Sequence, residues 1–115
     1  MSQNAPEFKD NDMYRLLRDE NIKEFNTRKE AGDKCDLSGA DFRNLVLSGI
    51  NADGLDLSGC YFRGCDLRGI NFSNTNLEGA SIHDAQISGV LFPNELCAEE
   101  ISLSLNHGIR MRYKC

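Results

Sequence analysis

The stretch that decides the fold begins with CDLSG at residues 35–39, continues with ADFRN at residues 40–44, and keeps the same five-residue pattern up to residue 94. The third place of the pattern is apolar in all twelve copies: Leu37, Phe42, Leu47, Ala52, Leu57, Phe62, Leu67, Phe72, Leu77, Ile82, Ile87 and Phe92. A period of five belongs neither to an α-helix, with about 3.6 residues per turn, nor to a β-strand, with a period of about two. The pattern therefore predicts a chain that turns a corner every five residues.

The fifth place of each copy is the predicted corner. It carries only Gly, Asn or Asp, which are the residues that best tolerate a positive φ: Gly39, Asn44, Gly49, Gly54, Gly59, Gly64, Gly69, Asn74, Gly79, Asp84, Gly89 and Asn94. A type II turn requires a positive φ at its third residue. We therefore expect a turn of this kind at every place five.

The first place is small or medium-sized and mostly apolar, so we expect it to point inward beside place three, while the polar places two and four point outward. A second period of twenty residues lies on top of the first, as in Leu37, Leu57 and Leu77, or Phe42 and Phe62. Twenty residues make four corners, which is one square coil. Stacked coils of this kind would place like residues above one another in internal ladders.

The best copies of the pattern resemble the pentapeptide-repeat family: CDLSG (35–39), ADFRN (40–44), LDLSG (55–59), CDLRG (65–69) and TNLEG (75–79). The resemblance covers residues 35–94. It implies a mainly β fold, a right-handed quadrilateral β-helix of about three coils. Departures from the family pattern are mild, with Val46, Tyr61 and Leu91 replacing the usual Asp or Asn at place two.

The open edges of such a stack need covers. After a flexible segment at residues 1–11, residues 12–34 are predicted to form a helical cap that lays Leu16, Leu17, Ile22 and Phe25 on the first coil. A free amphipathic helix that binds a partner or a membrane surface is the alternative.

Residues 95–108 are predicted to form a helix that closes the last coil. The same helix could instead pair with its copy in a homodimer, as the resemblance suggests for some family members. Residues 109–115 form a basic tail. We interpret this tail as a flexible terminus, with a short anchor for an acidic partner as the alternative.

The charge balance argues against direct nucleic-acid binding. The net charge is −5, and there is no basic stripe that would follow a phosphate backbone. The N-terminus is polar, with no secretory or membrane-spanning run, so we expect a cytoplasmic protein that does not enter a membrane. The five cysteines are an odd number, which also suits a reducing compartment.

No catalytic, cofactor or metal site is predicted. His83 and His107 lack a nucleophile in a known arrangement. Cys60 and Cys65 would lie on neighbouring inner corners of one coil, where a metal or redox pair is conceivable, but packing as small apolar residues is the simpler interpretation.

The outer faces are therefore the predicted working surface, and the protein is expected to be a non-enzymatic interaction or scaffold module with a protein partner. The candidate contact residues are Asp41, Arg43, Tyr61, Arg63 and His83. The resemblance offers an alternative, because some family members mimic DNA and bind type II topoisomerases such as gyrase. Three coils would be only about 14 Å tall, which is short for a DNA mimic. An enzyme is the third and least favoured class.

Overall fold

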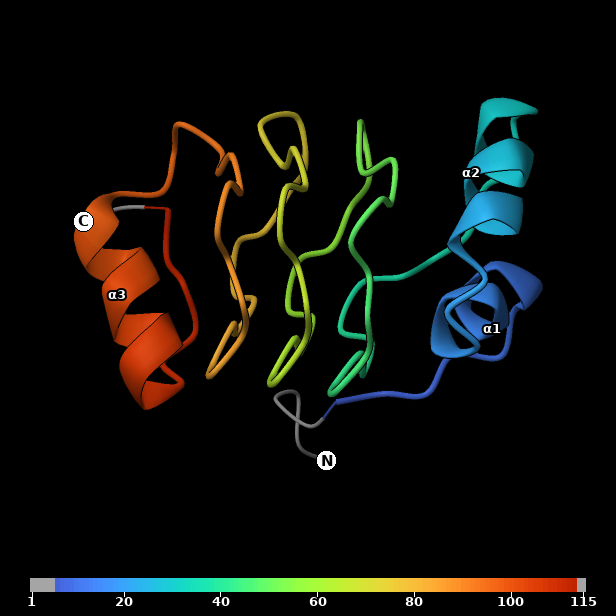
Figure 1. The fold of residues 1–115 in the computed structure, drawn as a ribbon. Coiled ribbons are helices and arrows are strands. Elements are labelled where there is room, and N and C mark those ends of the chain that lie inside the picture. The colour runs from blue at the N-terminus through green and yellow to red at the C-terminus, as the bar shows by residue number, and fades with distance from the viewer. Residues whose placement is uncertain (1–5, 114–115) are drawn as a thin grey trace.

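The computed structural model describes residues 6–113. Helices α1 (Asp12–Arg18) and α2 (Ile22–Glu30) lie at one end of the molecule, and α3 (Ala98–His107) lies at the other (Figure 1). Between them the chain winds through a stack of loops. The helices begin where the sequence provides caps, because the side chains of Asn11 and Asn21 accept from the backbone N–H of Tyr14 and Glu24.

The loops are stacked with a register of twenty residues. Isolated parallel bridges join residues twenty positions apart on all four sides of the stack: Asp41 to Tyr61 to Ser81, Val46 to Asp66 to Gln86, Asp56 to Asn76, and Asn71 to Leu91. This is the register predicted from the second period of the sequence. It makes residues 35–94 a solenoid in which like places of the pattern lie above one another.

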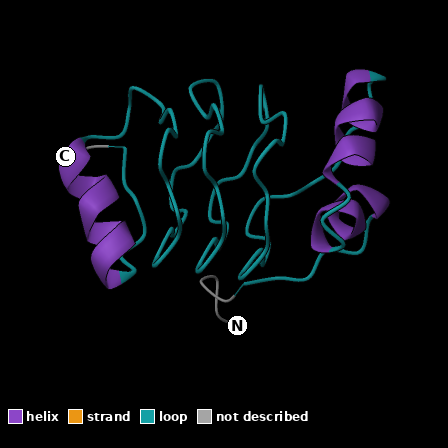
Figure 2. Cartoon of the chain, in the orientation of Figure 1, coloured by secondary structure: helices purple, strands orange, loops and turns teal. Residues whose placement is uncertain are grey.

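The expectation of a mainly β fold is corrected in one respect. The described residues contain isolated bridges but no continuous strand or sheet, so the stack is drawn as loop (Figure 2). The reason is the corner itself, since a turn every five residues leaves each side too short for an extended run. The right-handed sense and the count of about three coils stay predictions.

The corners follow the predicted turn chemistry at ten of the twelve fifth places, where φ is positive. At two of them, Ala40 N–H donates to Leu37 O and Cys60 N–H donates to Leu57 O, both at 3.2 Å. Asn74 and Asn94 are the exceptions, because neither has a positive φ. The Asn74 amide instead reaches back to Asp53 Oδ1 at 2.9 Å, so this corner is built differently.

Ladders of large side chains fill the interior. Phe42 and Phe62 stack with ring centroids 5.5 Å apart and planes 10° apart. Tyr14 of α1 continues this ladder, because its ring lies 5.4 Å from that of Phe42. Leu37, Leu57 and Leu77 form a second buried ladder. The core thus runs from the helices into the solenoid without a break.

The packing of α1 and α2 differs in detail from the prediction. Leu17 and Phe25 are buried as expected, whereas Leu16 and Ile22 are only partly buried. The sequence pattern missed Met13 and Tyr14, which are buried in the same core.

The segment before α1 was predicted to be flexible, but its described part pairs with the first coil. Glu7 N–H donates to Gly39 O at 3.0 Å, and Glu7 O accepts from Asp41 N–H at 2.7 Å. Lys9 is held between the carboxylates of Glu7 and Asp36. Residues 6–11 thus cover an open edge of the first coil, a contact that the sequence did not predict, and flexibility of this segment stays a prediction. Residues 1–5 lie outside the described part of the chain.

The segment after α3 covers the opposite edge in the same way. Met111 is fully buried, its N–H donates to Ala80 O at 2.9 Å, and its carbonyl accepts from Gly79 N–H at 2.6 Å. Arg112 forms an ion pair with Glu100 of α3. Residues 109–113 thus cover the edge of the last coil, a contact that the sequence did not predict, and flexibility of the tail stays a prediction. Residues 114–115 lie outside the described part.

Helix α3 contributes further contacts to the last coil. Ser104 Oγ accepts from Ile82 N–H at 2.9 Å, and Leu105 O accepts from Asp84 N–H at 3.0 Å. The side of α3 that carries Leu103, which is 37% exposed, faces away from the core. Dimerisation through α3 stays a prediction. Within residues 6–113, no helix has the length and apolar character needed to cross a bilayer.

Candidate protein-contact surface

The candidate surface is built on the second side of each coil, which we call the second face and define by Asp41, Arg43, Tyr61, Arg63, Ser81 and His83. Bridges from Asp41 to Tyr61 and from Tyr61 to Ser81 fix the spacing of its backbone. Glu7 extends this ladder at one end, and Met111 extends it at the other. Side chains at places two and four of this face are therefore presented from a rigid backbone.

Asp41 and Arg43 form the innermost pair of the second face. The Asp41 carboxylate, 5% exposed, accepts from Arg43 Nε at 3.0 Å and from Arg43 Nη2 at 2.7 Å. Burial alone would raise the pKa of Asp41, but the hydrogen bonds and charge of Arg43 hold that pKa below its usual range. Asp41 is consequently a buried support for Arg43 and does not itself reach a partner.

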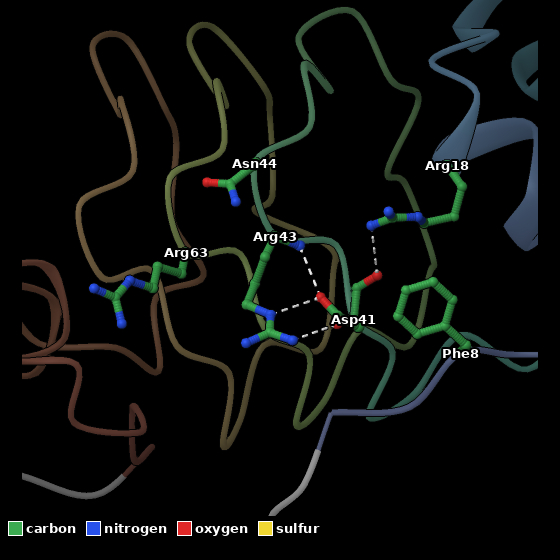
Figure 3. Close-up of a pocket in the computed structure, with 6 residues that line it drawn as sticks. All are labelled: Phe8, Arg18, Asp41, Arg43, Asn44 and Arg63. Carbon is green, nitrogen blue, oxygen red and sulfur yellow. Dashed lines mark hydrogen bonds and ion pairs between the residues drawn. The ribbon is translucent and has the colours of Figure 1, made fainter.

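A shallow hollow of about 380 Å³ lies beside this pair, and we call it the arginine pocket (Figure 3). It is lined by Phe8, Arg18, Asp41, Arg43, Asn44 and Arg63. Arg18 comes from the end of α1, and its guanidinium carbon lies 4.8 Å from the centroid of the Phe8 ring. Nη1 of Arg18 also makes a long hydrogen bond of 3.4 Å to Asp41 O.

Arg63 projects from the neighbouring coil and points away from Asp41 (Figure 3). Its side chain is exposed and makes no hydrogen bond or ion pair within residues 6–113, while its backbone carbonyl accepts from Asn44 N–H at 2.8 Å. The arginine pocket is thus lined by three arginines and one aspartate, and of these arginines only Arg43 contacts the Asp41 carboxylate. Its local charge is positive, although the whole chain carries −5.

The other two predicted contact residues lie under the C-terminal part of the chain. Arg110 covers the ring of Tyr61, with its guanidinium carbon 4.6 Å from the ring centroid. The His83 ring lies against Gly108, and its Nε2 is 3.4 Å from Asp84 Oδ2. Within the described residues, the buried His83 Nδ1 has no hydrogen-bond partner. Tyr61 and His83 are therefore less accessible than the sequence predicts.

The pocket also contains residues that sequence reasoning missed, namely Phe8, Arg18 and Asn44. Phe8 and Arg18 lie outside the repeat, so no periodic pattern places them beside Arg43. Phe8 carries the stronger signal, because it is 68% exposed and an exposed aromatic residue often marks a contact surface.

The arrangement suits recognition of a negatively charged group, because arginine donates in the planar geometry that a carboxylate or phosphate accepts. No group of three or more His, Cys, Asp or Glu residues within 6–113 is placed to hold a metal ion. Cys60 and Cys65 are buried free thiols whose Sγ atoms donate to Leu37 O and Phe42 O. Burial raises the pKa of Cys60 to about 12 and that of Cys65 to about 11, so neither is a ready nucleophile.

Comparison with known proteins identifies the repeated segment. Residues 56–92 match the family model described as pentapeptide repeats, in eight copies. The resemblance predicted from the sequence is confirmed for this segment, while residues 35–55 carry the same five-residue pattern outside the match. No curated protein and no solved structure matches the chain.

Proposed function

We propose that this chain, whose residues 56–92 are pentapeptide repeats, is a non-enzymatic interaction module that binds a protein partner through its second face. We place it in the cytoplasm and take its repeat segment as a right-handed stack of about three square coils. The observation that carries the proposal is the arginine pocket, where exposed cationic side chains stand on a backbone that is hydrogen-bonded on both edges.

The interior of the solenoid supports a surface role. Its ladders of Leu and Phe are nearly all buried and closely packed, so the repeat offers outer faces to a partner. Enzymes that act on small molecules usually bind the substrate in an enclosed cavity with convergent polar groups. The arginine pocket is instead an open hollow on one side of the stack.

The experiment is capture of partners from lysate of the parent cell on immobilised protein, compared with the variant Arg63→Glu. The Arg63 side chain is exposed and makes no hydrogen bond or ion pair within residues 6–113, so the charge reversal should leave the fold intact. We expect the wild-type chain to retain a reproducible protein partner that Arg63→Glu loses.

The matched control is Arg68→Glu. Arg68 occupies the same place of the pattern on the next face, where it pairs with Asp66 at 2.8 Å. A partner lost equally in both variants would point to general charge, and a partner retained by both would refute the second face as the binding surface.

The same capture experiment also tests the alternative function, in which the protein mimics DNA and binds gyrase. The acidic side of the stack carries Asp36 and Asp56, whereas the second face carries Arg43 and Arg63 beside Asp41, which argues against mimicry of a uniformly acidic polymer. Gyrase subunits captured from the lysate, together with inhibition of supercoiling by micromolar protein, would favour mimicry over the proposed module.

A further inference from the structure

We propose that the arginine pocket binds an acidic peptide segment of the partner, with one carboxylate on Arg63 and an apolar side chain against Phe8. This inference rests on the proposed function and deepens it by naming the chemistry of the bound segment. The pocket combines cationic and aromatic surface on the same wall, since Arg18 lies over the Phe8 ring.

The three arginines are committed to intramolecular contacts to different degrees. Arg43 uses Nε and Nη2 on the Asp41 carboxylate, so its charge is largely balanced. The Arg18 side chain makes a 3.4 Å hydrogen bond to a backbone carbonyl and lies over the Phe8 ring, and it forms no ion pair within residues 6–113. The guanidinium group of Arg63 has no hydrogen-bond or ion-pair partner in the described range, so it is the group best able to bind a new carboxylate.

Phe8 provides the second half of the site. Its side chain is 68% exposed although its backbone neighbours are held by the pairing of Glu7 with Gly39 and Asp41. The ring also meets Tyr14 edge-on, with centroids 6.0 Å apart, which fixes its position. A fixed and exposed aromatic ring is a suitable anchor for an apolar side chain of a bound peptide.

The charge distribution favours a peptide over a nucleic acid or an anionic membrane. Extended polyanions present charge at close intervals over a long distance, and they would also approach the acidic sides of this chain. Two of the three arginines of the repeat, Arg43 and Arg63, line the arginine pocket, and neither Asp36 nor Asp56 is among its lining residues, so a short segment suits this site.

The test is a fluorescence anisotropy titration of the full chain with a short labelled peptide in which one Phe is flanked by Glu residues. Three further probes accompany it: the same peptide with Gln for Glu, the same peptide with Ala for Phe, and a short labelled oligothymidine. The protein variants are Arg63→Gln in the pocket and Arg68→Gln as the matched control. Circular dichroism of both variants checks that the fold is retained.

We expect saturable binding of the acidic peptide that weakens about fivefold in Arg63→Gln and remains unchanged in Arg68→Gln. Replacing Glu by Gln or Phe by Ala in the peptide should weaken binding, and added salt should do the same for the acidic peptide. Tighter binding of oligothymidine, equal effects of the two arginine variants, or equal binding of the Gln peptide would overturn the inference.

The titration also separates this inference from the proposed function. If Arg63→Glu abolishes partner capture but the acidic peptide does not bind, the second face is the interaction surface and the acidic-segment inference is wrong. If the peptide binds as expected while partner capture is independent of Arg63, the pocket is an anion site and the proposed function is wrong.

Discussion

The guanidinium carbon of Arg110 lies 4.6 Å from the centroid of the Tyr61 ring, and Nη2 of the same arginine hydrogen-bonds to the Tyr61 hydroxyl oxygen at 2.6 Å. Nη1 of Arg110 also donates to Gly79 O at 2.6 Å and to Gly59 O at 3.3 Å. One side chain thus joins two coils to the segment that follows α3. This contact divides the second face into a covered part near Tyr61 and an open part near Arg63.

Arg110→Ala should destabilise the protein by about 1–3 kcal/mol, because it removes hydrogen bonds to two carbonyl groups and a cation–π contact. The measurement is urea-induced unfolding followed by circular dichroism. Arg63→Ala provides the control, since an exposed arginine without local contacts should change the unfolding free energy by less than about 0.5 kcal/mol. Similar losses in both variants would contradict a closing role for Arg110.

The corner at Gly64 gives a prediction about backbone geometry. Gly64 has a φ of 71° and lies above Asn44, so a Cβ added at Gly64 would overlap Asn44 Oδ1. Gly69 has a similar φ of 76°, but an added Cβ would meet nothing within 4 Å. Gly69→Ala should therefore cost about 1–2 kcal/mol for the left-handed conformation alone, and Gly64→Ala should cost more.

A double variant isolates the steric part of that cost. In the background Asn44→Gly, the overlap at residue 64 is gone, so Gly64→Ala should cost only about as much as Gly69→Ala. The unfolding free energies of the four proteins form a cycle. Equal costs of Gly64→Ala with and without Asn44 would show that the overlap is relieved by a small side-chain movement.

The repeated part of the fold was predictable because each place of the pattern has one dominant physical demand. The ladder of Leu37, Leu57 and Leu77 is buried, and the apolar departures Val46 and Leu91 at place two are exposed, as the place predicts. The incorrect prediction of a positive φ at Asn74 also follows from the demand at its place in the pattern. Asn74 tolerates a positive φ but does not require it, so its side chain can build another corner.

The two ends and the candidate site were predicted less well because they depend on contacts between residues distant in sequence. Met111 pairs with Ala80 through backbone atoms, and such pairing leaves no side-chain pattern to recognise. Phe8 and Arg18 line the same pocket as Arg43 because Glu7 joins the first coil and α1 packs on Phe42. The periodic sequence could place Arg43 and Arg63 on one face, but it could not show that a pocket would form beside them.

Two ion pairs, Asp41 with Arg43 and Glu100 with Arg112, predict that the fold loses stability in acid. Hydrogen bonds from Arg43 outweigh burial to lower the pKa of Asp41, and Arg112 lowers the pKa of Glu100. Folded pKa values below the unfolded values of about 3.9 and 4.3 mean that both groups stabilise the fold above those values. Their contribution is lost as the pH falls through the lower, folded pKa values, so the unfolding free energy should decrease below about pH 5.

Asp41→Asn tests the contribution of the buried pair. At neutral pH it should destabilise the protein by about 1–3 kcal/mol, since Asn cannot form the charged bidentate pair with Arg43. The difference from wild type should shrink as the pH falls and the wild-type carboxyl takes up its proton. The control is Asp19→Asn, at an exposed residue with no ion pair in the described part of the chain. A difference that is independent of pH would contradict the assigned role of the Asp41 charge.

The buried thiols provide the last prediction. Alkylating reagents attack the thiolate, and burial raises the pKa of Cys60 to about 12 and that of Cys65 to about 11, while their Sγ atoms donate to backbone carbonyl groups. Cys35 is only half-buried, although burial raises its pKa too. At about pH 8, iodoacetamide should therefore modify Cys35 in the native protein and reach Cys60 and Cys65 only in urea. Peptide mapping by mass spectrometry measures the three sites separately. Two outcomes would contradict a purely structural role for Cys60 and Cys65. One is labelling of Cys60 in the native protein as fast as that of Cys35, and the other is a stoichiometric zinc ion that is released on such labelling.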